Sequence, residues 1–280
     1  MVSVVSTGHH MTDRYAVIGN PIAQSKSPLL HAAFARQCGH DLRYDAILAA
    51  PDAFRETVLD FIAAGGRGMN VTAPFKLEAA GLADTLTERA RAAGAVNTLK
   101  FGPEGILGDN TDGVGLVGDI QDRLGVSLAG RRVLVIGAGG AARGILLPLL
   151  RARPADVLVV NRTADRARDL ADAMAPWGRI QGGPLSAAGG REYDVVIHAT
   201  SAGLNAGEAP AVDYRVATGG LAYDLAYGGD TPFMRQARDR GASRVVDGLG
   251  MLVGQAAESY RVWRGVLPDV RPVLERLRPA

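Results

Sequence analysis

Near the middle of the chain, residues 133–142 read VLVIGAGGAA, and a largely apolar run follows from Arg143. The four aliphatic residues predict a buried strand, and the glycines predict a tight turn directly after it. In a dinucleotide-binding unit, the first glycine (Gly137) permits the turn and the second (Gly139) lets the backbone approach a pyrophosphate. The small residue Ala142 lets the following helix pack closely on the strand. This strand, turn and helix indicate a site for a dinucleotide, with its phosphates at the helix N-terminus.

The alternative interpretation is a tight strand-to-helix turn that binds nothing. The next predicted strand favours binding, because Asn161-Arg162-Thr163 follows it where such a site meets the adenosine ribose. An acidic residue there would accept the 2′-hydroxyl of NAD, whereas an arginine accommodates the 2′-phosphate of NADP. Arg162 is present, the acid is absent, and Arg166 adds a charge one helical turn later, although Asp165 nearby weakens the case. The sequence therefore predicts NADP, with an ordinary exposed arginine as the alternative for Arg162.

Short apolar runs alternate with helical stretches on both sides of this loop, which predicts βαβ units and the α/β class. Before the loop, we expect strands at 15–18, 42–47, 68–71 and 96–101. After it begins, we expect strands at 132–136, 156–160, 195–199, 221–224 and 244–246. The stretch 177–191 is rich in glycine and is predicted to be irregular. Mostly parallel sheets are expected throughout.

A chain of 280 residues is long enough for two domains at roughly 100–200 residues each. Leu116, Ile120 and Leu124 recur every fourth residue and mark one face of a helix that we expect to link them. The last segment, 249–278, is helical, and its apolar face needs a partner outside a complete sheet, so we expect it to return to the first domain. The predicted domains are an N-terminal substrate domain, 12–113 plus 248–280, and a Rossmann-type NADP-binding domain, 114–247.

The composition argues for a globular protein with a small-molecule ligand. Hydrophobic residues are 47% and charged residues 21%, and a net charge of +2 with scattered arginines makes nucleic acid an unexpected partner. No apolar stretch approaches the roughly 18 residues of a membrane span. The single cysteine, Cys38, excludes an intramolecular disulfide and multi-cysteine metal sites, so we expect a cytoplasmic protein without a metal. Residues 1–11 do not resemble a signal peptide and look like a tag remnant or a frayed start.

Lysine is scarce in this chain. Lys26, Lys76 and Lys100 are the only lysines among 31 basic residues, so 31 − 3 = 28 are arginines. Lys76 ends the segment NVTAPFK, residues 70–76, in the first turn of a predicted helix, where a cation opposes the helix dipole. This unfavourable position indicates a functional role for Lys76 rather than that of an ordinary surface lysine.

Further polar side chains follow the predicted strands of the first domain. Ser25 and Ser27 can bind a small polyhydroxylated or carboxylated molecule, but Ser27 could instead cap the next helix and Ser25 could be a turn residue. Asn97 could merely satisfy backbone groups, and Asp112 could be a helix N-cap. Taken together, a lysine and an aspartate facing a cofactor cleft supply what proton transfer coupled to hydride transfer requires.

From about Tyr15 to Ala257 the chain resembles the shikimate dehydrogenases of aromatic amino-acid biosynthesis. The resemblance rests on eight motifs in the family's order: GNPIAQSKSP (19–28), NVTAPFK (70–76), AGAVNTL (93–99), GDNTDG (108–113), GAGGAARG (137–144), NRT (161–163), YDLAYGGDTPF (223–233) and DGLGMLVGQAA (247–257). It implies an oxidoreductase that reversibly reduces 3-dehydroshikimate to shikimate with NADPH, on the route to chorismate, without a metal.

The resemblance also implies roles for individual residues. Lys76 and Asp112 would be the catalytic pair. The residues around the substrate would be Ser25, Ser27, Asn70, Thr72, Asn97, Tyr227 and Gln255. The contacts to NADP would be Gly137, Ala138, Gly139, Gly140, Ala141, Asn161, Arg162, Thr163, Leu225 and Gly248, with Arg166 beside them. Glu88 stands where some members place an acidic residue near the cofactor. The protein is expected to be a monomer or a homodimer.

Two departures from the family pattern are visible. Gln24 stands where His is frequent, and His198 stands where Asn is frequent. Neither removes a side chain that the mechanism requires, and we expect His198 to pack near the cofactor cleft rather than act as an acid or base. Two alternatives remain: a quinate/shikimate dehydrogenase that uses NAD, which Arg162 disfavours, and a non-catalytic metabolite sensor, which the presence of both Lys76 and Asp112 disfavours.

Overall fold

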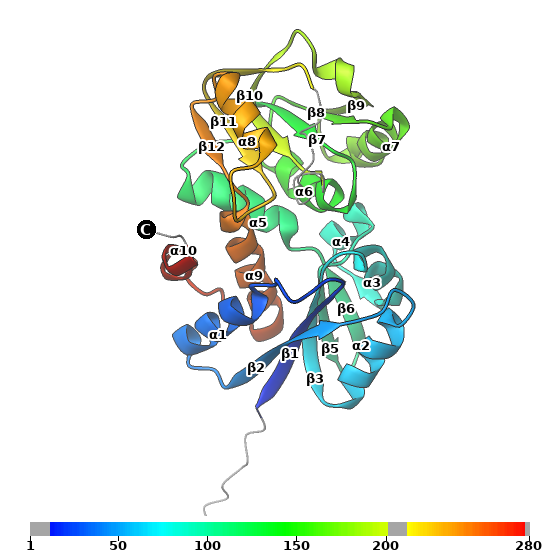
Figure 1. Cartoon of the computed structure of the whole chain (residues 1–280). Helices are drawn as coiled ribbons and strands as arrows, with labels where there is room; N and C mark the ends of the chain where they lie inside the picture. The colour runs from blue at the N-terminus through cyan, green and yellow to red at the C-terminus, as the bar shows by residue number, and fades with distance from the viewer. Residues whose placement is uncertain (1–11, 201–211, 278–280) are drawn as a thin grey trace, which may run out of the picture.

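The computed structural model describes residues 12–200 and 212–277 (Figure 1). The chain forms two six-stranded sheets, each with its own helices, and the two lie at opposite ends of the molecule in Figure 1. The α/β class and the two-part architecture predicted from the sequence are therefore confirmed. Residues 1–11, for which a tag remnant or frayed start was expected, and 278–280 lie outside the described residues.

The first sheet contains three parallel strands extended by an antiparallel hairpin. Its strands are β1 (Asp13–Gly19), β2 (Leu42–Leu48), β3 (Gly66–Val71), β4 (Thr85–Leu86), β5 (Thr98–Gly102) and β6 (Gly105–Asp109), in the order β2-β1-β3-β5-β6-β4. Strand β1 pairs in parallel with β2 and β3, whereas β5 runs antiparallel to β3 and β6. Strand β4 pairs in parallel with β6, so the expectation of a mostly parallel sheet holds on this side too, with β5 as the antiparallel strand. Two residues join β5 to β6, and Gly105, at φ +103°, supplies a backbone conformation that side-chain-bearing residues rarely adopt.

Four helices belong to this sheet: α1 (Ser27–Cys38), α2 (Phe54–Ala63), α3 (Lys76–Leu82) and α4 (Glu88–Ala93). The apolar residues of α2 that recur at helical spacing, Phe54, Val58 and Phe61, are all buried. They join a core with Ile18 of β1 and Met69 of β3. The rings of Phe54 and Phe75 stack with their centroids 4.9 Å apart, which fixes the turn before α3.

The second sheet is entirely parallel. Its strands are β7 (Arg132–Ile136), β8 (Asp156–Asn161), β9 (Ile180–Pro184), β10 (Glu192–His198), β11 (Arg215–Asp224) and β12 (Arg244–Val246), in the order β12-β11-β10-β7-β8-β9. Renumbered within the sheet, this order is 3-2-1-4-5-6 read from β9, the doubly wound order of dinucleotide-binding domains. Strand order reverses between β7 and β10, and such folds bind their ligand at that point.

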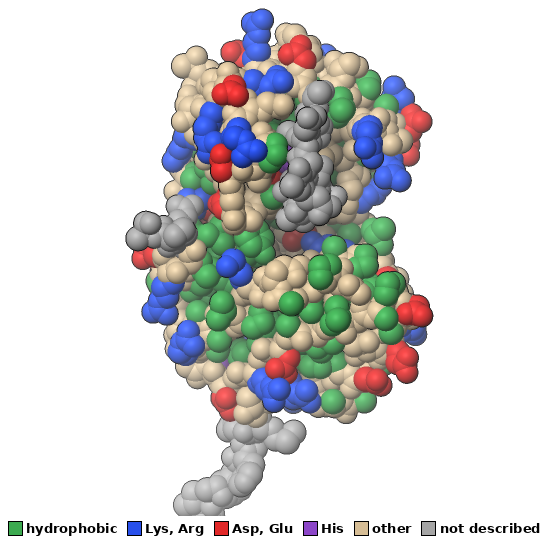
Figure 2. Space-filling model, in the orientation of Figure 1, with side chains coloured by type: hydrophobic (Ala, Val, Ile, Leu, Met, Phe, Trp, Pro, Cys, Tyr) green, Lys and Arg blue, Asp and Glu red, His purple; other side chains and the backbone are tan. Residues whose placement is uncertain are grey.

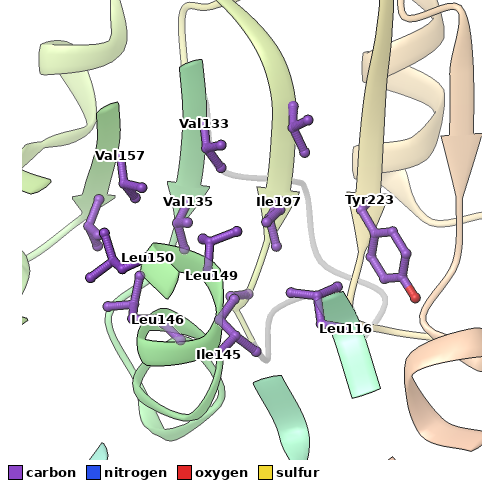
Figure 3. Packing of buried hydrophobic residues seen from close by; sticks show 14 of the residues in the cluster. Leu116, Val133, Val135, Ile145, Leu146, Leu149, Leu150, Val157, Ile197 and Tyr223 are labelled. Carbon is purple, nitrogen blue, oxygen red and sulfur yellow. The ribbon is translucent and has the colours of Figure 1, made fainter. Parts of the chain in front are cut away.

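Helices α6 (Gly140–Arg151), α7 (Ala164–Met174) and α8 (Pro232–Asp239) accompany this sheet. Figure 3 shows Ile145 and Leu149 of α6 packed against Val135 of β7 and Ile197 of β10. Strand β9 lies within 177–191, so the prediction of an irregular segment there is wrong. The glycines of β9 lack the side-chain pattern by which a strand is predicted. They are required because a Cβ at Gly182 would lie 2.0 Å from the carbonyl oxygen of Ala167, so α7 crosses the strand too closely for any side chain.

Two helices connect the halves. Helix α5 (Asp112–Gly118) continues through one wide helical turn, η1 (Asp119–Arg123), and packs against α9 (Leu249–Arg264), which precedes α10 (Arg271–Leu277). The two backbones nearly touch, since a Cβ on Gly254 would lie 3.1 Å from the Cα of Gly115. The predicted helix face at Leu116, Ile120 and Leu124 is buried.

The C-terminal helices return to the first sheet, as predicted. The indole nitrogen of Trp263 in α9 donates a hydrogen bond to the carbonyl oxygen of Leu99 in β5, at 2.9 Å. Val253 and Tyr260 of the same helix pack with Leu30 and Phe34 of α1. Across residues 12–200 and 212–277, no helix is both long and apolar enough to span a bilayer.

Candidate active site

A cleft of about 780 Å³ lies where the ends of β1 and β3 face the start of α9. Figure 2 shows the surface hollowed between the two halves of the molecule. Every residue that the sequence predicted for catalysis or for the substrate lines this cleft: Ser25, Ser27, Asn70, Thr72, Lys76, Asn97, Asp112, Tyr227 and Gln255. Leu225 and Gly248, predicted to contact the cofactor, line it too.

The cleft forms because parallel strands deliver their following loops to the same edge of a sheet. Ile18 of β1 is in register with Val71 of β3, and the amide of Thr72 donates to the carbonyl oxygen of Ile18 at 3.0 Å. A Cβ on Gly19 would lie 2.4 Å from the methyl carbon of Thr72, so the glycine allows the two loops to close on each other.

Lys76 and Asp112 form an ion pair inside the cleft. The Nζ of Lys76 donates to Oδ2 of Asp112 at 2.5 Å, and the Asp112 residue is 5% exposed. Asp112 is the first residue of α5, where the helix dipole stabilises a carboxylate, while Thr111 occupies the cap position. The alternative that Asp112 serves as the helix N-cap is therefore not what the structure shows.

Asn97 holds Asp112 in place. Its Nδ2 donates to Oδ1 of Asp112 at 2.8 Å, and its Oδ1 accepts the backbone N–H of Thr111 at 2.9 Å. The backbone role considered from the sequence is thus real, but the same amide also orients the carboxylate. Nδ2 lies 3.3 Å from Oε1 of Gln255 as well, which ties α9 to the pair.

The Asn70 side chain has its hydrogen-bonding groups satisfied by the protein. Its Oδ1 accepts from the hydroxyl of Tyr44 at 2.7 Å and lies 3.1 Å from Nε2 of His31, and its Nδ2 donates to Oγ of Ser259 at 2.9 Å. Burial lowers the pKa of His31 to about 3, so the ring is neutral and Nε2 carries the proton that Asn70 accepts. Asn70 therefore shapes the wall of the cleft.

The sequence did not single out His31, Tyr44 and Ser259, three of the partners of Asn70. Tyr44 lies on β2, His31 on α1 and Ser259 on α9, so only the tertiary fold brings them to one place. Burial raises the pKa of Tyr44 well above its ordinary value, and a hydrogen bond to Ser27 opposes that rise. Tyr44 thus links the wall at Asn70 to the cleft residue Ser27.

For Ser25 and Ser27, the sequence left open a turn role and a helix-capping role, and the structure shows the first of these but not the second. Oγ of Ser25 accepts the backbone N–H of Ser27 at 3.3 Å, so Ser25 has the turn role that the sequence allowed. Ser27 does not cap α1: it is the first helical residue, and Lys26 occupies the cap position without a side-chain capping bond. Lys26 itself lines the cleft, and only the scarcity of lysine signalled it in the sequence.

The glycine loop has the geometry of a phosphate site. Gly137 has φ +118°, and a Cβ there would lie 2.8 Å from the carbonyl oxygen of Ala199, so the turn requires glycine. Within residues 12–200 and 212–277, a Cβ on Gly139 or Gly140 would have no atom within 4 Å, so these residues leave the outer face of the loop open. Helix α6 starts at Gly140, and its first N–H groups have no partner within the helix. The loop therefore fits a pyrophosphate.

The end of β8 fits a 2′-phosphate. Arg162 and Arg166 are exposed, and neither forms an ion pair with any acid in residues 12–200 and 212–277. Asp165 instead pairs with Arg168, at 2.7 Å, so much of its negative charge is compensated within α7. The amide of Asn161 donates to the carbonyl oxygen of Thr163 at 3.0 Å and holds the turn.

The structure does not support the prediction that Glu88 lies at the cofactor. Glu88 begins α4 and accepts a hydrogen bond from Arg151 at 2.5 Å, which lowers its pKa. Arg151 is the last residue of α6, whereas the phosphate loop meets the first. At about 1.5 Å per residue the two ends of this twelve-residue helix lie roughly 16 Å apart. Helix α4 packs against the far end of α6, which the sequence could not reveal.

His198 is buried beside the glycine loop. Its Nδ1 lies 3.0 Å from Oδ1 of Asp224, its Nε2 lies 2.7 Å from Oγ1 of Thr200, and its ring stacks on Phe233. Thr200 borders the loop, since a Cβ on Gly137 would lie 2.9 Å from its methyl carbon. The expectation that His198 packs rather than acts in the cleft agrees with this burial. In the described part of the chain, no three His, Cys, Asp or Glu side chains gather as metal ligands.

Three family models match the chain. They are the shikimate dehydrogenase substrate binding domain over residues 17–99, shikimate/quinate 5-dehydrogenase over 119–218, and the shikimate 5′-dehydrogenase C-terminal domain over 248–278. The shikimate dehydrogenase (NADP⁺) of Aromatoleum aromaticum is 57% identical over 271 residues, covering 95% of this chain and 97% of that protein.

Solved structures agree with these matches. An Ael1 enzyme from Pseudomonas putida superposes with a TM-score of 0.88 at 47% identity, covering 96% of this chain and 99% of that one. Shikimate 5-dehydrogenase from Thermus thermophilus, solved with NADP(H) and shikimate, gives a TM-score of 0.82 at 33% identity, covering 94% and 97%. With three family models in order and a close relative along nearly its whole length, this chain belongs to the shikimate dehydrogenase family.

Proposed function

We propose that this protein catalyses the reversible, NADPH-dependent reduction of 3-dehydroshikimate to shikimate, a step of aromatic amino-acid biosynthesis. The observation that carries the proposal is the part-buried Lys76–Asp112 pair, at 2.5 Å, in a cleft walled by hydroxyl and amide side chains. A polyhydroxylated ring needs such a wall, and reduction of its carbonyl needs a proton donor.

Lys76 is the proposed proton donor. Its ammonium has three N–H donors, of which Asp112 takes one, so the others can reach a carbonyl oxygen in the cleft. In the reverse direction, the same amine accepts the proton of the substrate hydroxyl. Asp112, fixed by Asn97, holds Nζ in place through this cycle.

NADPH supplies the hydride when it is bound. The open loop at Gly139 and Gly140 supports a role for the first amides of α6 in holding its pyrophosphate. Arg162 and Arg166 would pair with the 2′-phosphate. The proposed cofactor contacts are Gly137, Ala138, Gly139, Gly140, Ala141, Asn161, Arg162, Thr163, Arg166, Leu225 and Gly248. Leu225 and Gly248 also line the substrate cleft, which supports a nicotinamide site at that junction.

The proposed substrate contacts are Ser25, Ser27, Thr72, Asn97, Tyr227 and Gln255, with Asn70 behind them. Burial raises the pKa of Tyr227, so its hydroxyl remains a hydrogen-bond donor at neutral pH. Met251 and Leu252 add an apolar part to the lining. The cleft therefore offers donors and acceptors for ring hydroxyls and a dry surface for ring carbons.

We assign residues 12–113 and 248–280 to the substrate domain and 114–247 to the NADP-binding domain. Separate sheets on either side of α5 and α9 support this division. We place the protein in the cytoplasm as a monomer or homodimer without nucleic-acid partners, in line with one cysteine and a net charge of +2.

Steady-state assays with shikimate and quinate, each against NADP⁺ and NAD⁺, test the proposal. We expect shikimate with NADP⁺ to give the highest kcat/KM, at least tenfold above shikimate with NAD⁺. A preference for quinate with NAD⁺ would instead support a quinate/shikimate dehydrogenase. Binding of shikimate without turnover would support a metabolite sensor.

A further inference from the structure

Four charged side chains form a charge network next to the loop that carries Asp112: Arg89, Asp109, Glu258 and Arg261. Nε and Nη2 of Arg89, in α4, donate to the two carboxylate oxygens of Asp109, at the end of β6, at 2.7 and 2.6 Å. Nη2 of Arg89 also lies 2.8 Å from Oε1 of Glu258 in α9, and Arg261 pairs with that glutamate at 2.6 Å. The side chains of Asp109 and Glu258 are 3% and 5% exposed. The first sheet, α4 and α9 therefore meet at two buried carboxylates held by arginines.

Stability alone does not account for these charges. Burial by itself would raise the pKa of Asp109 and of Glu258, but the hydrogen bonds and the charge of the neighbouring arginines lower both pKa values overall, so both groups are carboxylates at neutral pH. Removing such ions from water is costly, and well-packed apolar side chains in place of a buried ion pair often give an equally stable protein. A bidentate pair between arginine and carboxylate supplies something else, because its two parallel hydrogen bonds fix the orientation of both groups.

The charge network continues to the proposed proton donor through the loop that follows β6. Oδ1 of Asp109 accepts the backbone N–H of Asn110 at 2.7 Å, and Oδ1 of Asn110 accepts the backbone N–H of Asp112 at 3.2 Å. Asp112 in turn accepts from Nζ of Lys76 at 2.5 Å. Every residue from 109 to 112 is buried. A shift of the Asp109 carboxylate would therefore move the carboxylate that holds Lys76.

Helix α9 contacts the same loop at a second point. Gln255 lies one helical turn before Glu258, and its Oε1 lies 3.5 Å from Oγ1 of Thr111. The hydroxyl of Ser259 lies 3.2 Å from the same Thr111 oxygen. Because Gln255 lines the cleft, α9 joins the charge network to the place where the substrate is proposed to bind.

We propose that Arg89 is a positioning residue, which acts through Asp109 and the loop 109–112 on the orientation of Asp112. This inference rests on the proposed function, since it takes the Lys76–Asp112 pair as the groups that transfer the proton. Arg89 is not among the described residues that line the cleft. Loss of its bidentate geometry therefore lowers kcat and leaves KM for shikimate and for NADP⁺ nearly unchanged.

The experiment compares two arginines in matched surroundings. Arg89→Lys keeps the positive charge but not the planar fork that bonds to both oxygens of a carboxylate. Arg123→Lys is the control, because Arg123 forms the same bidentate pair with Asp119. The side chains of that pair are 20% and 3% exposed, against 17% and 3% for Arg89 and Asp109. Each substitution is made in the wild type and in Asp112→Asn. Steady-state kinetics give kcat and both KM values, and urea denaturation gives the stability.

We expect Arg89→Lys to lower kcat about tenfold to a hundredfold, since a misplacement of roughly 1 Å that begins away from the chemistry can cost about a hundredfold. In the Asp112→Asn background the same substitution should lower kcat little further, because the group through which Arg89 acts has already lost its charge. Arg123→Lys should lose a similar amount of stability, and it should keep the kcat of its parent in both backgrounds.

Equal falls of kcat in the two backgrounds would show that Arg89 does not act through Asp112 and would overturn the proposal. Equal values of kcat for Arg89→Lys and Arg123→Lys would overturn it as well. If Arg89→Lys does not fold, Glu258→Gln takes its place in the same comparison, because it removes one charge from the network and keeps the shape of the side chain. If Asp112→Asn is too slow to measure, the comparison with Arg123→Lys decides.

The wild type separates this inference from the proposed function. Turnover of shikimate with NADP⁺ by the wild type, together with a normal kcat in Arg89→Lys, overturns the role of Arg89 alone. Absence of that turnover in the wild type overturns the proposed function, and the role of Arg89 with it.

Discussion

The two sides of the proposed active site are built differently. On the substrate side, Asn70, Asn97 and Asp112 are 6%, 2% and 5% exposed. Nδ2 of Asn70 donates to the carbonyl oxygen of Asn97, and Nδ2 of Asn97 donates to Oδ1 of Asp112. On the cofactor side, the loop at Gly139 is open and Arg162 is exposed. The hydrogen bonds of Asn70, Asn97 and Asp112 form without a ligand. On the cofactor side, the first amides of α6 have no partner within their helix, and Arg162 forms no ion pair within residues 12–200 and 212–277.

This difference decides when each side is ordered. On the substrate side, the free-energy cost of desolvating and ordering the side chains is part of the folding free energy. These groups are therefore in place before the reaction. On the cofactor side, part of this free-energy cost arises when the cofactor binds, and it lowers the binding affinity. Substitutions on the substrate side should therefore change kcat and stability, and those on the cofactor side should change KM for one ligand.

The largest effect is expected at Lys76. Lys76→Ala should lower kcat by about 10²–10⁴, the usual contribution of a positioned acid or base, with little change in NADPH affinity. Initial rates with saturating NADPH and fluorescence titration of the cofactor measure the two quantities. Lys76→Arg should also be impaired, because a guanidinium does not release a proton at working pH. Near-normal kcat in that variant would leave Lys76 only an electrostatic role.

Asn97→Ala tests whether the substrate side is ordered by folding. The substitution leaves the N–H of Thr111 and one oxygen of Asp112 without their partner, so we expect a loss of about 1–3 kcal/mol in the free energy of unfolding. Urea denaturation measures it. Asn161→Ala is the matched amide on the cofactor side and should lose less than about 0.5 kcal/mol. Equal losses at the two positions would contradict the comparison.

His31 gives the substrate side a specific sensitivity to acid. Its pKa is about 3 in the folded protein against an ordinary value of 6.5, so below pH 6.5 the unfolded chain takes up a proton that the folded one does not. Stability therefore falls with pH between about 6.5 and 3, by about 2 kcal/mol at pH 5 at 1.36 kcal/mol per unit. Denaturation of His31→Gln at pH 7 and 5 should show a difference smaller by that amount. An unchanged pH dependence would mean that His31 is protonated in the native state.

The smallest effect is expected on the cofactor side. Arg162→Ala should raise KM for NADPH about tenfold and leave NADH use nearly unchanged, because only NADPH carries the 2′-phosphate. Arg215, exposed at the opposite end of the strands of the same sheet, provides the control variant Arg215→Ala. Kinetics with both cofactors measure the split. A parallel loss with NADH would indicate that Arg162 holds the turn.

Local signals explain what the sequence predicted well. The strand at Val133–Ile136 and the glycines after it are contiguous, and strand ends place loops such as those at Ser25 and Thr72 on one edge by a general rule. The family resemblance supplied Tyr227 and Gln255, which have no local signal of their own.

Long-range packing explains what the sequence did not predict. Ser259 and Asn70 are 189 positions apart in the sequence. His31 lies on the buried face of its helix like an ordinary core residue, so its position in the sequence does not mark it as a partner of Asn70. Strand β9 contains glycines because α7 lies against it, which removes the usual pattern of a strand. The role of Glu88 was predicted from its position in the sequence of the family, whereas its contact with Arg151 depends on how α4 packs against α6.

The glycine contact between α5 and α9 also bears on how this enzyme can be rebuilt. The chain leaves the first sheet through α5 and returns through α9, and Gly115 and Gly254 bring the two helices into backbone contact. The whole nucleotide-binding half is therefore topologically an insertion whose two ends emerge side by side, the arrangement in which domain insertions are tolerated. A different nucleotide-binding unit with equally close termini can replace it without breaking a strand of the first sheet. Such an exchange would change preference for the coenzyme and leave most of the substrate cleft in place, except for residues such as Leu225 and Tyr227, which the nucleotide-binding half contributes to that cleft.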